Sequence, residues 1–309
     1  MIQVSSCKIE RFWLHEILLS SQSLSVRVAE ELRKAVVIFE DSGVESAAAN
    51  AQWLMAHVLG CHRPELGLKQ SSTLTVEQKS QWNQLVTQRA RRIPLQHLIG
   101  SVEFCGLELV VNKHVLVPRP ETETLAEEAC KFTKMRESPV VLDIGTGSGC
   151  LAIAIAAQSP KGAVHALDIS KDALKLAQVN ANRNGLSERI IFHETDMREV
   201  CPIEEALDLI VSNPPYIPTT EIDTLQEEVR EHDPRLALDG GEDGLDYYHS
   251  LTVNYLRHLK PQGRLMLEVG DGQAQKVSDL IIKYGGCVLD IVSDLNNVER
   301  IVVASPDNS

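Results

Sequence analysis

Apolar residues in the first third of the chain recur at steps of three and four, which is the spacing of one face of an α-helix. Three segments show this spacing, over residues 25–43, 45–60 and 75–91. The first two end in glycine, and the third opens with a threonine and, three residues later, a glutamine, which together can form a capping box. The pattern predicts a small all-helical domain over residues 26–100.

A short alternating stretch follows the helices. The apolar residues that alternate there are Phe104, Leu107, Leu109 and Val111. Alternation is typical of a strand with one buried face, and Asn112 with Lys113 are turn-forming residues. We therefore expect a β-hairpin over residues 101–117 that turns at Asn112 and Lys113 and connects two larger bodies.

From residue 118 onward, seven short apolar runs are separated by longer helical segments. Such alternation predicts βαβ units, and therefore an α/β fold with a doubly wound, mostly parallel, Rossmann-like sheet covered on both faces. The last two runs are close together, so we expect an antiparallel hairpin at the edge of the sheet. This domain is expected over residues 118–309, and residues 1–25 form an N-terminal extension of uncertain order.

Charge limits the kind of partner. The 309 residues include 30 Lys and Arg against 43 Asp and Glu, a formal charge of −13. An excess of acidic residues argues against holding nucleic acid by neutralising phosphates, so no direct nucleic-acid binding is expected. The one basic run contains Arg89, Arg91 and Arg92, and it is either a solvated helix end or a docking surface for a protein partner.

The cysteines and the longest apolar runs indicate in which cellular compartment the protein is expected. Seven cysteines lie far apart, without a CxxC pair, which predicts neither a disulfide framework nor a zinc site. The histidines show no metal-ligand spacing, so no metal is expected. No apolar run reaches the length of a membrane-spanning helix, and no signal-peptide pattern is evident. We expect a cytoplasmic monomer that does not bind membranes.

A glycine-rich turn follows the first apolar run of the α/β domain. Gly145, Thr146, Gly147, Ser148 and Gly149 stand between the predicted strand VVLDI and the helical CLAIAIAAQ. Glycines at a strand-to-helix turn let a ligand approach the backbone and leave the helix N-terminal donors exposed. The spacing is neither the GxGxxG of dinucleotide enzymes nor a P-loop, so we predict a different cofactor.

Asp168 ends the second predicted strand, nineteen residues after Gly149. A carboxylate in this place can accept hydrogen bonds from both ribose hydroxyls of a nucleoside, although it could instead cap the next helix. Asp143, the glycine turn and Asp168 together resemble the S-adenosylmethionine site of class I methyltransferases.

The sequence DLIVSNPPYIP ends a buried strand in a way that sheet pairing does not require. Prolines have no backbone donor, so Asn213, Pro214, Pro215 and Tyr216 lie just beyond the strand. The side-chain oxygen of Asn213 and the carbonyl of Pro214 can accept both hydrogens of a planar amino group, and Tyr216 can stack on it. An amide or aromatic amine held in this way is a suitable methyl acceptor.

Five blocks in order identify the chain as similar to the HemK/PrmC family, the glutamine methyltransferases of peptide chain release factors. They read VLVPRPETETL, LDIGTGSGCLAIAIA, DLIVSNPPYIP, HDPRLALDGGEDGLDYY and PQGRLMLEVGDGQ. The resemblance implies methyl transfer from S-adenosylmethionine to the glutamine of the Gly-Gly-Gln loop of class 1 release factors. It places the cofactor at Gly145–Gly149, Asp168, Asp196, Met197 and Asn213, and the glutamine at Asn213–Tyr216. The helical domain would recognise the substrate.

Two alternatives remain open for the substrate, namely a glutamine of a large-subunit ribosomal protein and an amino group of a nucleic acid. The role of PRPETE, with Arg119, Glu121 and Glu123, is also open. We expect that it either folds over the ligand site or forms salt bridges with the helical domain.

Overall fold

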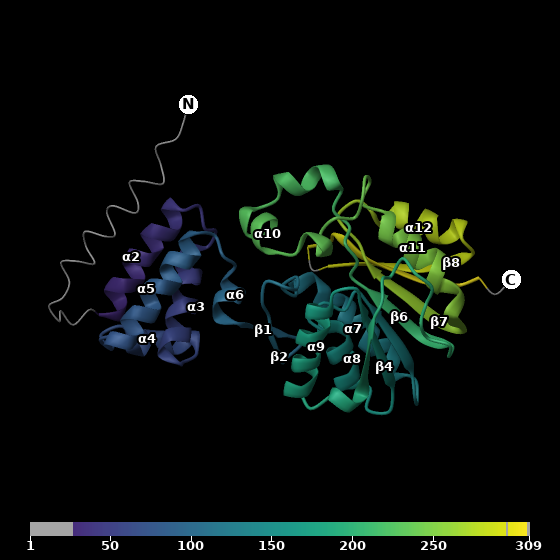
Figure 1. The fold of residues 1–309 in the computed structure, drawn as a ribbon, viewed down its shortest axis with the longest axis horizontal. Coiled ribbons are helices and arrows are strands. Elements are labelled where there is room, and N and C mark those ends of the chain that lie inside the picture. The colour runs from purple at the N-terminus through teal and green to yellow at the C-terminus, as the bar shows by residue number, and fades with distance from the viewer. Residues whose placement is uncertain (1–26, 295, 308–309) are drawn as a thin grey trace. The chain divides into compact units, whose positions relative to one another are not determined.

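The computed structural model describes residues 27–294 and 296–307. The chain divides into two compact units, residues 1–98 and 99–309 (Figure 1). The predicted N-terminal extension, residues 1–25, lies outside the described residues. Within the described ranges, no helix combines the length and the apolar content that crossing a membrane requires.

The first unit is helical. Its helices are α2 (Val28–Asp41), α3 (Ala47–Leu59), α4 (Leu66–Lys69), α5 (Val76–Ala90) and α6 (Leu95–Ile99), with a 3-10 turn at Arg63–Glu65. Helices α2, α3 and α5 pack together and bury Phe39, Leu54 and Trp82 almost completely. The predicted capping box is present at the start of α5. The Thr75 hydroxyl accepts from the backbone N–H of Gln78 at 3.2 Å, and Gln78 Oε1 accepts from that of Thr75 at 3.0 Å.

The basic run at the end of α5 is mostly engaged with the protein itself. Arg89 is 5% exposed, and its Nε donates to Asn50 Oδ1 at 2.8 Å. Arg92 Nη1 donates to the carbonyl of Gly43 at 2.7 Å. The interpretation of the run as a solvated helix end is therefore wrong for both side chains, because they donate to groups on neighbouring segments, and only Arg91 is exposed.

The second unit begins with the strands β1 (Ser101–Phe104) and β2 (Leu107–Val110), which form an antiparallel hairpin. The hairpin turns at Cys105 and Gly106, whose φ angles are 49° and 76°. Two positive φ angles in succession match the twist of a hairpin. The expected turn at Asn112 and Lys113 is therefore wrong. Asn112 Oδ1 instead accepts from the N–H of His114 at 2.9 Å and forms a local turn after the hairpin.

A seven-stranded sheet forms the body of the second unit. Its strands are β3 (Val140–Ile144), β4 (Ala163–Asp168), β5 (Ile190–Glu194), β6 (Leu207–Ser212), β7 (Leu259–Glu268), β8 (Gly286–Ser293) and β9 (Glu299–Pro306). The order is β5-β4-β3-β6-β7-β9-β8, with β3 to β7 parallel and β9 antiparallel to both β7 and β8. The predicted doubly wound sheet and its antiparallel edge hairpin are confirmed.

Helices cover both faces of this sheet (Figure 1). One face carries α7 (Pro120–Lys134), α8 (Cys150–Gln158) and α9 (Lys171–Arg183), and the other carries α11 (Asp246–Tyr255) and α12 (Ala274–Lys283). The segment between β6 and α11 holds α10 (Glu227–His232) and the 3-10 turns Thr219–Thr224 and Arg235–Ala237. Two further 3-10 turns are Ser187–Arg189 and Leu256–His258.

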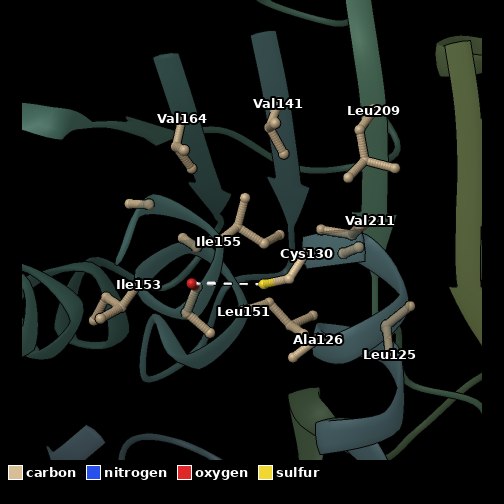
Figure 2. Packing of buried hydrophobic residues seen from close by; sticks show 14 of the residues in the cluster. Leu125, Ala126, Cys130, Val141, Leu151, Ile153, Ile155, Val164, Leu209 and Val211 are labelled. Atoms are coloured by element: carbon tan, nitrogen blue, oxygen red, sulfur yellow. Dashed lines mark hydrogen bonds between the residues drawn. The ribbon is translucent and has the colours of Figure 1, made fainter. Parts of the chain in front are cut away.

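Each face of the sheet has its own hydrophobic core. Val141 points to the core under α7 and α8, while the next residue, Leu142, points to the core under α11 and α12, as strand alternation requires. Figure 2 shows the first core, where the thiol of Cys130 lies 3.7 Å from the carbonyl oxygen of Ala154 on the neighbouring helix. Each large apolar side chain buried in this way contributes roughly 1.5 to 3 kcal/mol.

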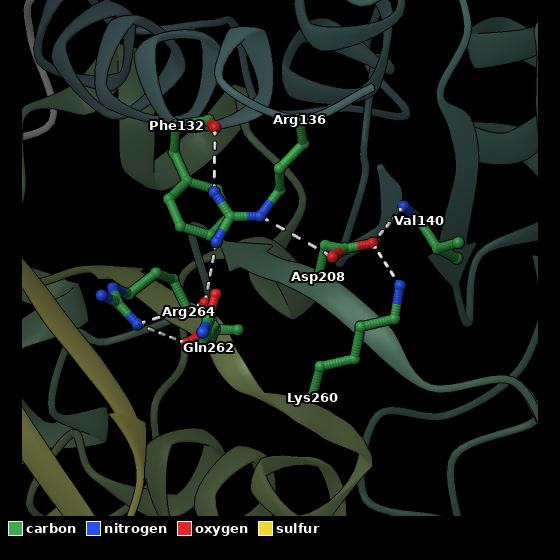
Figure 3. Close-up of polar contacts among 8 residues, drawn as sticks. Phe132, Arg136, Val140, Asp208, Lys260, Gln262 and Arg264 are labelled. Atoms are coloured by element: carbon green, nitrogen blue, oxygen red, sulfur yellow. Dashed lines mark hydrogen bonds and ion pairs between the residues drawn. The ribbon is translucent and has the colours of Figure 1, made fainter. Parts of the chain in front are cut away.

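A polar cluster holds the amino ends of three parallel strands together (Figure 3). Asp208, near the start of β6, accepts from the backbone N–H of Val140 at 2.9 Å and from Lys260 Nζ at 2.7 Å. Its other oxygen lies 3.7 Å from Arg136 Nε, and Arg136 Nη2 donates to the carbonyl of Gln262 at 2.8 Å. These contacts join β3, β6 and β7 at the end opposite to Asn213.

Candidate active site

A crevice in the second unit lies beyond the carboxyl ends of the parallel strands, where such sheets usually bind ligands. The strand order reverses beside β3, because α8 leads to β4 on one side while β6 lies on the other side. Loops that diverge at such a point leave a crevice beyond the carboxyl ends of the strands. The predicted residues that line it are Gly145, Thr146, Gly147, Ser148, Asp168, Asp196, Met197, Asn213 and Pro215. These predicted residues thus share one site, although they lie up to 70 positions apart in the sequence.

The glycine turn leaves β3 in a conformation that other residues rarely adopt. The φ angles of Gly145, Gly147 and Gly149 are 73°, 54° and 84°. Gly149 does not line the crevice, and it has another function. A Cβ there would lie 3.0 Å from Ile153 Cδ1 and 3.1 Å from Ala177 Cβ, so the missing side chain allows α8 and α9 to pack closely.

Asp143 supports the glycine turn from beneath. It is fully buried, and its Oδ2 accepts from Thr146 Oγ1 at 2.6 Å and from the N–H of Ala152 at 3.1 Å. Burial raises its pKa to about 7, against the two hydrogen bonds, which lower it. The backbone N–H groups of Gly145 and Thr146 donate to the carbonyl of Leu167, which ties the turn to β4.

Asp168 joins the glycine turn to the next helix. Its Oδ2 accepts from the N–H of Gly147 at 2.9 Å, and its Oδ1 accepts from the N–H of Ser170 at 2.8 Å. Ser170, not Asp168, caps α9, because its hydroxyl accepts from the N–H of Ala173 at 3.2 Å. Burial raises the pKa of Asp168, and these hydrogen bonds oppose the rise. Each carboxylate oxygen keeps a further lone pair for a ligand hydroxyl.

Asp196 and Met197 form another wall of the crevice. Asp196 makes a bidentate ion pair with Arg198, whose Nε donates to Oδ1 at 3.0 Å and whose Nη2 donates to Oδ2 at 2.6 Å, and this hydrogen bonding lowers the pKa of the Asp196 carboxyl group. Met197 is 8% exposed, and its Cε lies 3.0 Å from the place where a Cβ on Gly145 would be. A side chain at position 145 would crowd the end of Met197 and strain a turn whose φ is 73°.

Asn213 follows β6 directly, and its carboxamide has a defined orientation. Nδ2 donates to the hydroxyl of Thr122, on α7, at 3.1 Å. Among the described residues no donor is bonded to Oδ1, and Asn213 lines the crevice. The oxygen is therefore available to accept a hydrogen bond from a ligand.

The rest of the NPPY sequence lies around Asn213 in different ways. Pro215 lines the crevice, whereas Pro214 is buried and Tyr216 is partly buried, and neither lines it. Tyr216 lies against Gly270, where a Cβ would be 3.0 Å from its Cδ2, and its carbonyl accepts from Gln273 Nε2 at 2.9 Å. Burial raises the pKa of the Tyr216 phenol to about 12, so it is neutral at physiological pH.

Several lining residues were not singled out from the sequence. They include Thr122, Pro234, Leu236, Ala237 and Tyr247, and all lie within blocks that carry the family resemblance. The PRPETE segment pairs within its own unit, because Arg119 Nη2 lies 2.7 Å from Asp233 Oδ2, whose side chain is 2% exposed. This pair holds the loop with Pro234 and Leu236 over the crevice.

The crevice suits a nucleoside with an amino-acid tail better than a metal ion. Its space is about 1020 Å³, including the part open to solvent. An acceptor at Asp168, apolar walls at Met197 and Leu236, and an open backbone turn at Gly147 match ribose, a flat base and a polar tail. Within the described residues, no group of three or more His, Cys, Asp or Glu side chains could hold a metal ion.

Comparison with known proteins agrees with this geometry. Residues 30–100 match the PrmC N-terminal domain, and residues 123–242 match the methyltransferase small domain. The chain is 43% identical over 263 residues to the release factor glutamine methyltransferase of Geobacter sulfurreducens, covering 85% of this chain and 90% of that protein. It is 39% identical over 264 residues to the enzyme of the same name from Caulobacter vibrioides, covering 85% and 91%.

Among solved structures, the hMettl16 catalytic domain superposes with a TM-score of 0.52 at 14% identity, over 66% of this chain and 77% of that chain. This likeness shows the fold alone. The relatives share far more sequence, and they confirm the resemblance seen in the five sequence blocks. The chain therefore belongs to the HemK/PrmC family of release factor glutamine methyltransferases.

Proposed function

We propose that this protein transfers the methyl group of S-adenosylmethionine to the side-chain amide nitrogen of the glutamine in the Gly-Gly-Gln motif of class 1 peptide chain release factors. The observation that carries the proposal is the position of Asn213. Its carboxamide lines the same crevice as the glycine turn and Asp168, with Nδ2 bonded to Thr122 and the oxygen available.

The cofactor would lie along the glycine turn. The two oxygens of Asp168 would accept the ribose hydroxyls, Met197 would pack on the adenine beside Asp196, and Gly147 would allow close approach to the backbone. When bound, S-adenosylmethionine supplies a methyl group on a positively charged sulfur, which is electrophilic. Release factor and cofactor would then meet at Asn213.

The glutamine amide is a poor nucleophile because the lone pair of its nitrogen is delocalised. Asn213 Oδ1 and the carbonyl of Pro214 would each accept one N–H of this amide and favour the positive charge that develops on the nitrogen. Tyr216 does not line the crevice, so a stacking role for its ring stays a prediction. The methylated nitrogen becomes acidic and loses its proton to solvent, so no strong base is required before transfer.

Mass spectrometry tests this proposal directly. The purified protein is incubated with S-adenosylmethionine and a class 1 release factor, and the peptide that contains Gly-Gly-Gln is analysed. We expect this peptide to gain the mass of one methyl group, and a release factor with alanine in place of the motif glutamine to gain none. Methylation of a large-subunit ribosomal protein or of RNA, with none in the release factor, would refute the proposed substrate.

A further inference from the structure

Glu268 is a buried carboxyl group at the end of β7, next to the strand that leads to Asn213. Leu267 pairs with Ser212 across β7 and β6, so the following residues, Glu268 and Asn213, are neighbours at the carboxyl edge of the sheet. Glu268 is 2% exposed, and among the described residues its Oε2 has no hydrogen-bond partner. Burying a carboxyl group that is not fully hydrogen-bonded costs stability, which indicates a functional reason for its position.

Thr122 connects Glu268 to Asn213. It comes from α7, is 2% exposed, and its Oγ1 accepts from Asn213 Nδ2 at 3.1 Å. Its hydroxyl hydrogen remains for a second bond, and both Thr122 and Asn213 lie close enough to Glu268 to lower its pKa. A carboxylate only accepts hydrogen bonds, so an ionised Glu268 can accept from the Thr122 hydroxyl while the Thr122 oxygen accepts from Asn213.

The charges around Glu268 come from several elements. Burial raises its pKa to about 7, the hydrogen bond from Thr122 lowers it, Glu121 raises it, and Arg300 on β9 lowers it. Other ionisable groups whose pKa Glu268 raises in turn are Tyr216, Tyr248 and Cys150. Near neutral pH, both protonation states of Glu268 are therefore populated.

We propose that the ionised carboxylate of Glu268 is a positioning group which, through Thr122, keeps the Asn213 oxygen turned toward the substrate amide. The inference rests on the function proposed for this chain. A protonated Glu268 can donate to Thr122, whose hydroxyl can then donate to the Asn213 oxygen and stabilise a flipped carboxamide. A flipped Asn213 presents N–H groups to a substrate NH₂, and two donors cannot bond.

The kinetic test uses the full chain, a class 1 release factor and saturating S-adenosylmethionine, with kcat measured between about pH 6 and pH 8.5. We expect the wild-type kcat to rise as Glu268 ionises. Glu268→Gln should lower kcat roughly 10- to 100-fold, because a flipped Asn213 carboxamide no longer holds the substrate amide in the productive geometry. The variant should also lose the rise of kcat with pH. The KM for the release factor and the affinity for S-adenosylhomocysteine should change less than about threefold.

Thr122 provides matched variants that separate positioning from folding. Thr122→Ser keeps the hydroxyl and should keep kcat within about threefold, whereas the isosteric Thr122→Val should lose activity as Glu268→Gln does. Equal losses in the serine and valine variants would overturn the proposal. A Glu268→Gln enzyme with wild-type kcat and pH profile would also overturn it.

A second measurement needs no methyl transfer. The side-chain amide signals of Asn213 in a nitrogen-15 NMR spectrum should shift with an inflection near pH 7 in the wild-type protein and show none in Glu268→Gln. If the wild-type protein leaves the release factor unmethylated while these signals still titrate, the proposed function fails and the coupling of Glu268 to Asn213 stands. Signals without an inflection in the wild-type protein would overturn the coupling itself.

Discussion

Asp168→Asn tests the contribution of the Asp168 carboxylate to cofactor binding. The substitution keeps the size and shape of the side chain, so the crevice beside Gly147 is not enlarged. It replaces one of two acceptor oxygens by an NH₂ group, which must face either the N–H of Gly147 or that of Ser170, now bonded at 2.9 and 2.8 Å. The site therefore loses its charge and one acceptor together.

The expected loss of binding free energy follows from the hydrogen bonds that the substitution weakens or removes. A hydrogen bond to a charged group contributes roughly 1.5 to 3 kcal/mol, and a neutral one about half of that. With two ribose hydroxyls affected and one acceptor kept, we expect a loss of about 2 to 3 kcal/mol in binding free energy. This corresponds to roughly 30- to 150-fold weaker binding. The free protein should also lose about 1 to 3 kcal/mol of stability, because the N–H of either Gly147 or Ser170 loses its acceptor.

Isothermal titration calorimetry with S-adenosylhomocysteine measures this loss, and urea unfolding of the unliganded protein checks the fold. Asp172→Asn is a matched control, because Asp172 is exposed on α9 and pairs with Lys175 at 2.8 Å. The control should bind like the wild-type protein. A fold-intact Asp168→Asn variant that binds within about threefold of wild type would refute the assignment of Asp168 to the ribose.

Three further predictions follow. Asn213→Ala should reduce methyl transfer at least about 100-fold, because it removes the acceptor for the substrate amide, yet S-adenosylhomocysteine should bind nearly as to wild type. Calorimetry beside a rate assay checks this, and retained turnover would contradict it. Gly149→Ala should lower the free energy of unfolding in urea by about 2 to 4 kcal/mol, because φ is 84° and the added Cβ would contact Ile153 and Ala177. A loss under about 1 kcal/mol would contradict the inference that close packing of α8 and α9 requires glycine here. The rings of His165 and His193 are bonded at 3.0 Å, and burial lowers the pKa of both below the usual value of 6.5. The unfolded chain therefore binds more protons just below that pH, so unfolding free energy should fall as pH drops from about 7 toward 5.5, and His193→Asn should weaken this dependence. An unchanged dependence in the variant would show that other groups cause it.

Short sequence motifs were sufficient to predict the structure wherever a few consecutive residues form it by themselves. The capping box of Thr75 and Gln78 needs only one helical turn, and the glycine turn needs only its positive φ angles. The hairpin turn was misplaced because Cys105 at φ 49° is not a residue that favours this conformation, so the sequence carries no strong turn signal there. Neither interpretation of the basic run foresaw the buried contact of Arg89, because its acceptor, Asn50, lies 39 residues away in the sequence.

By itself, the sequence determined the family, the doubly wound sheet, the glycine turn with Asp168, and the position of Asn213 just after a strand. Each of these depends on periodicity or on short motifs, which local chemistry encodes. Only the tertiary structure decided that Asn213 bonds to Thr122, 91 residues earlier, and that Glu268 lies next to it. The physical reason is that these contacts arise from the register of β6 against β7 and from the packing of α7, and no spacing along the chain specifies either.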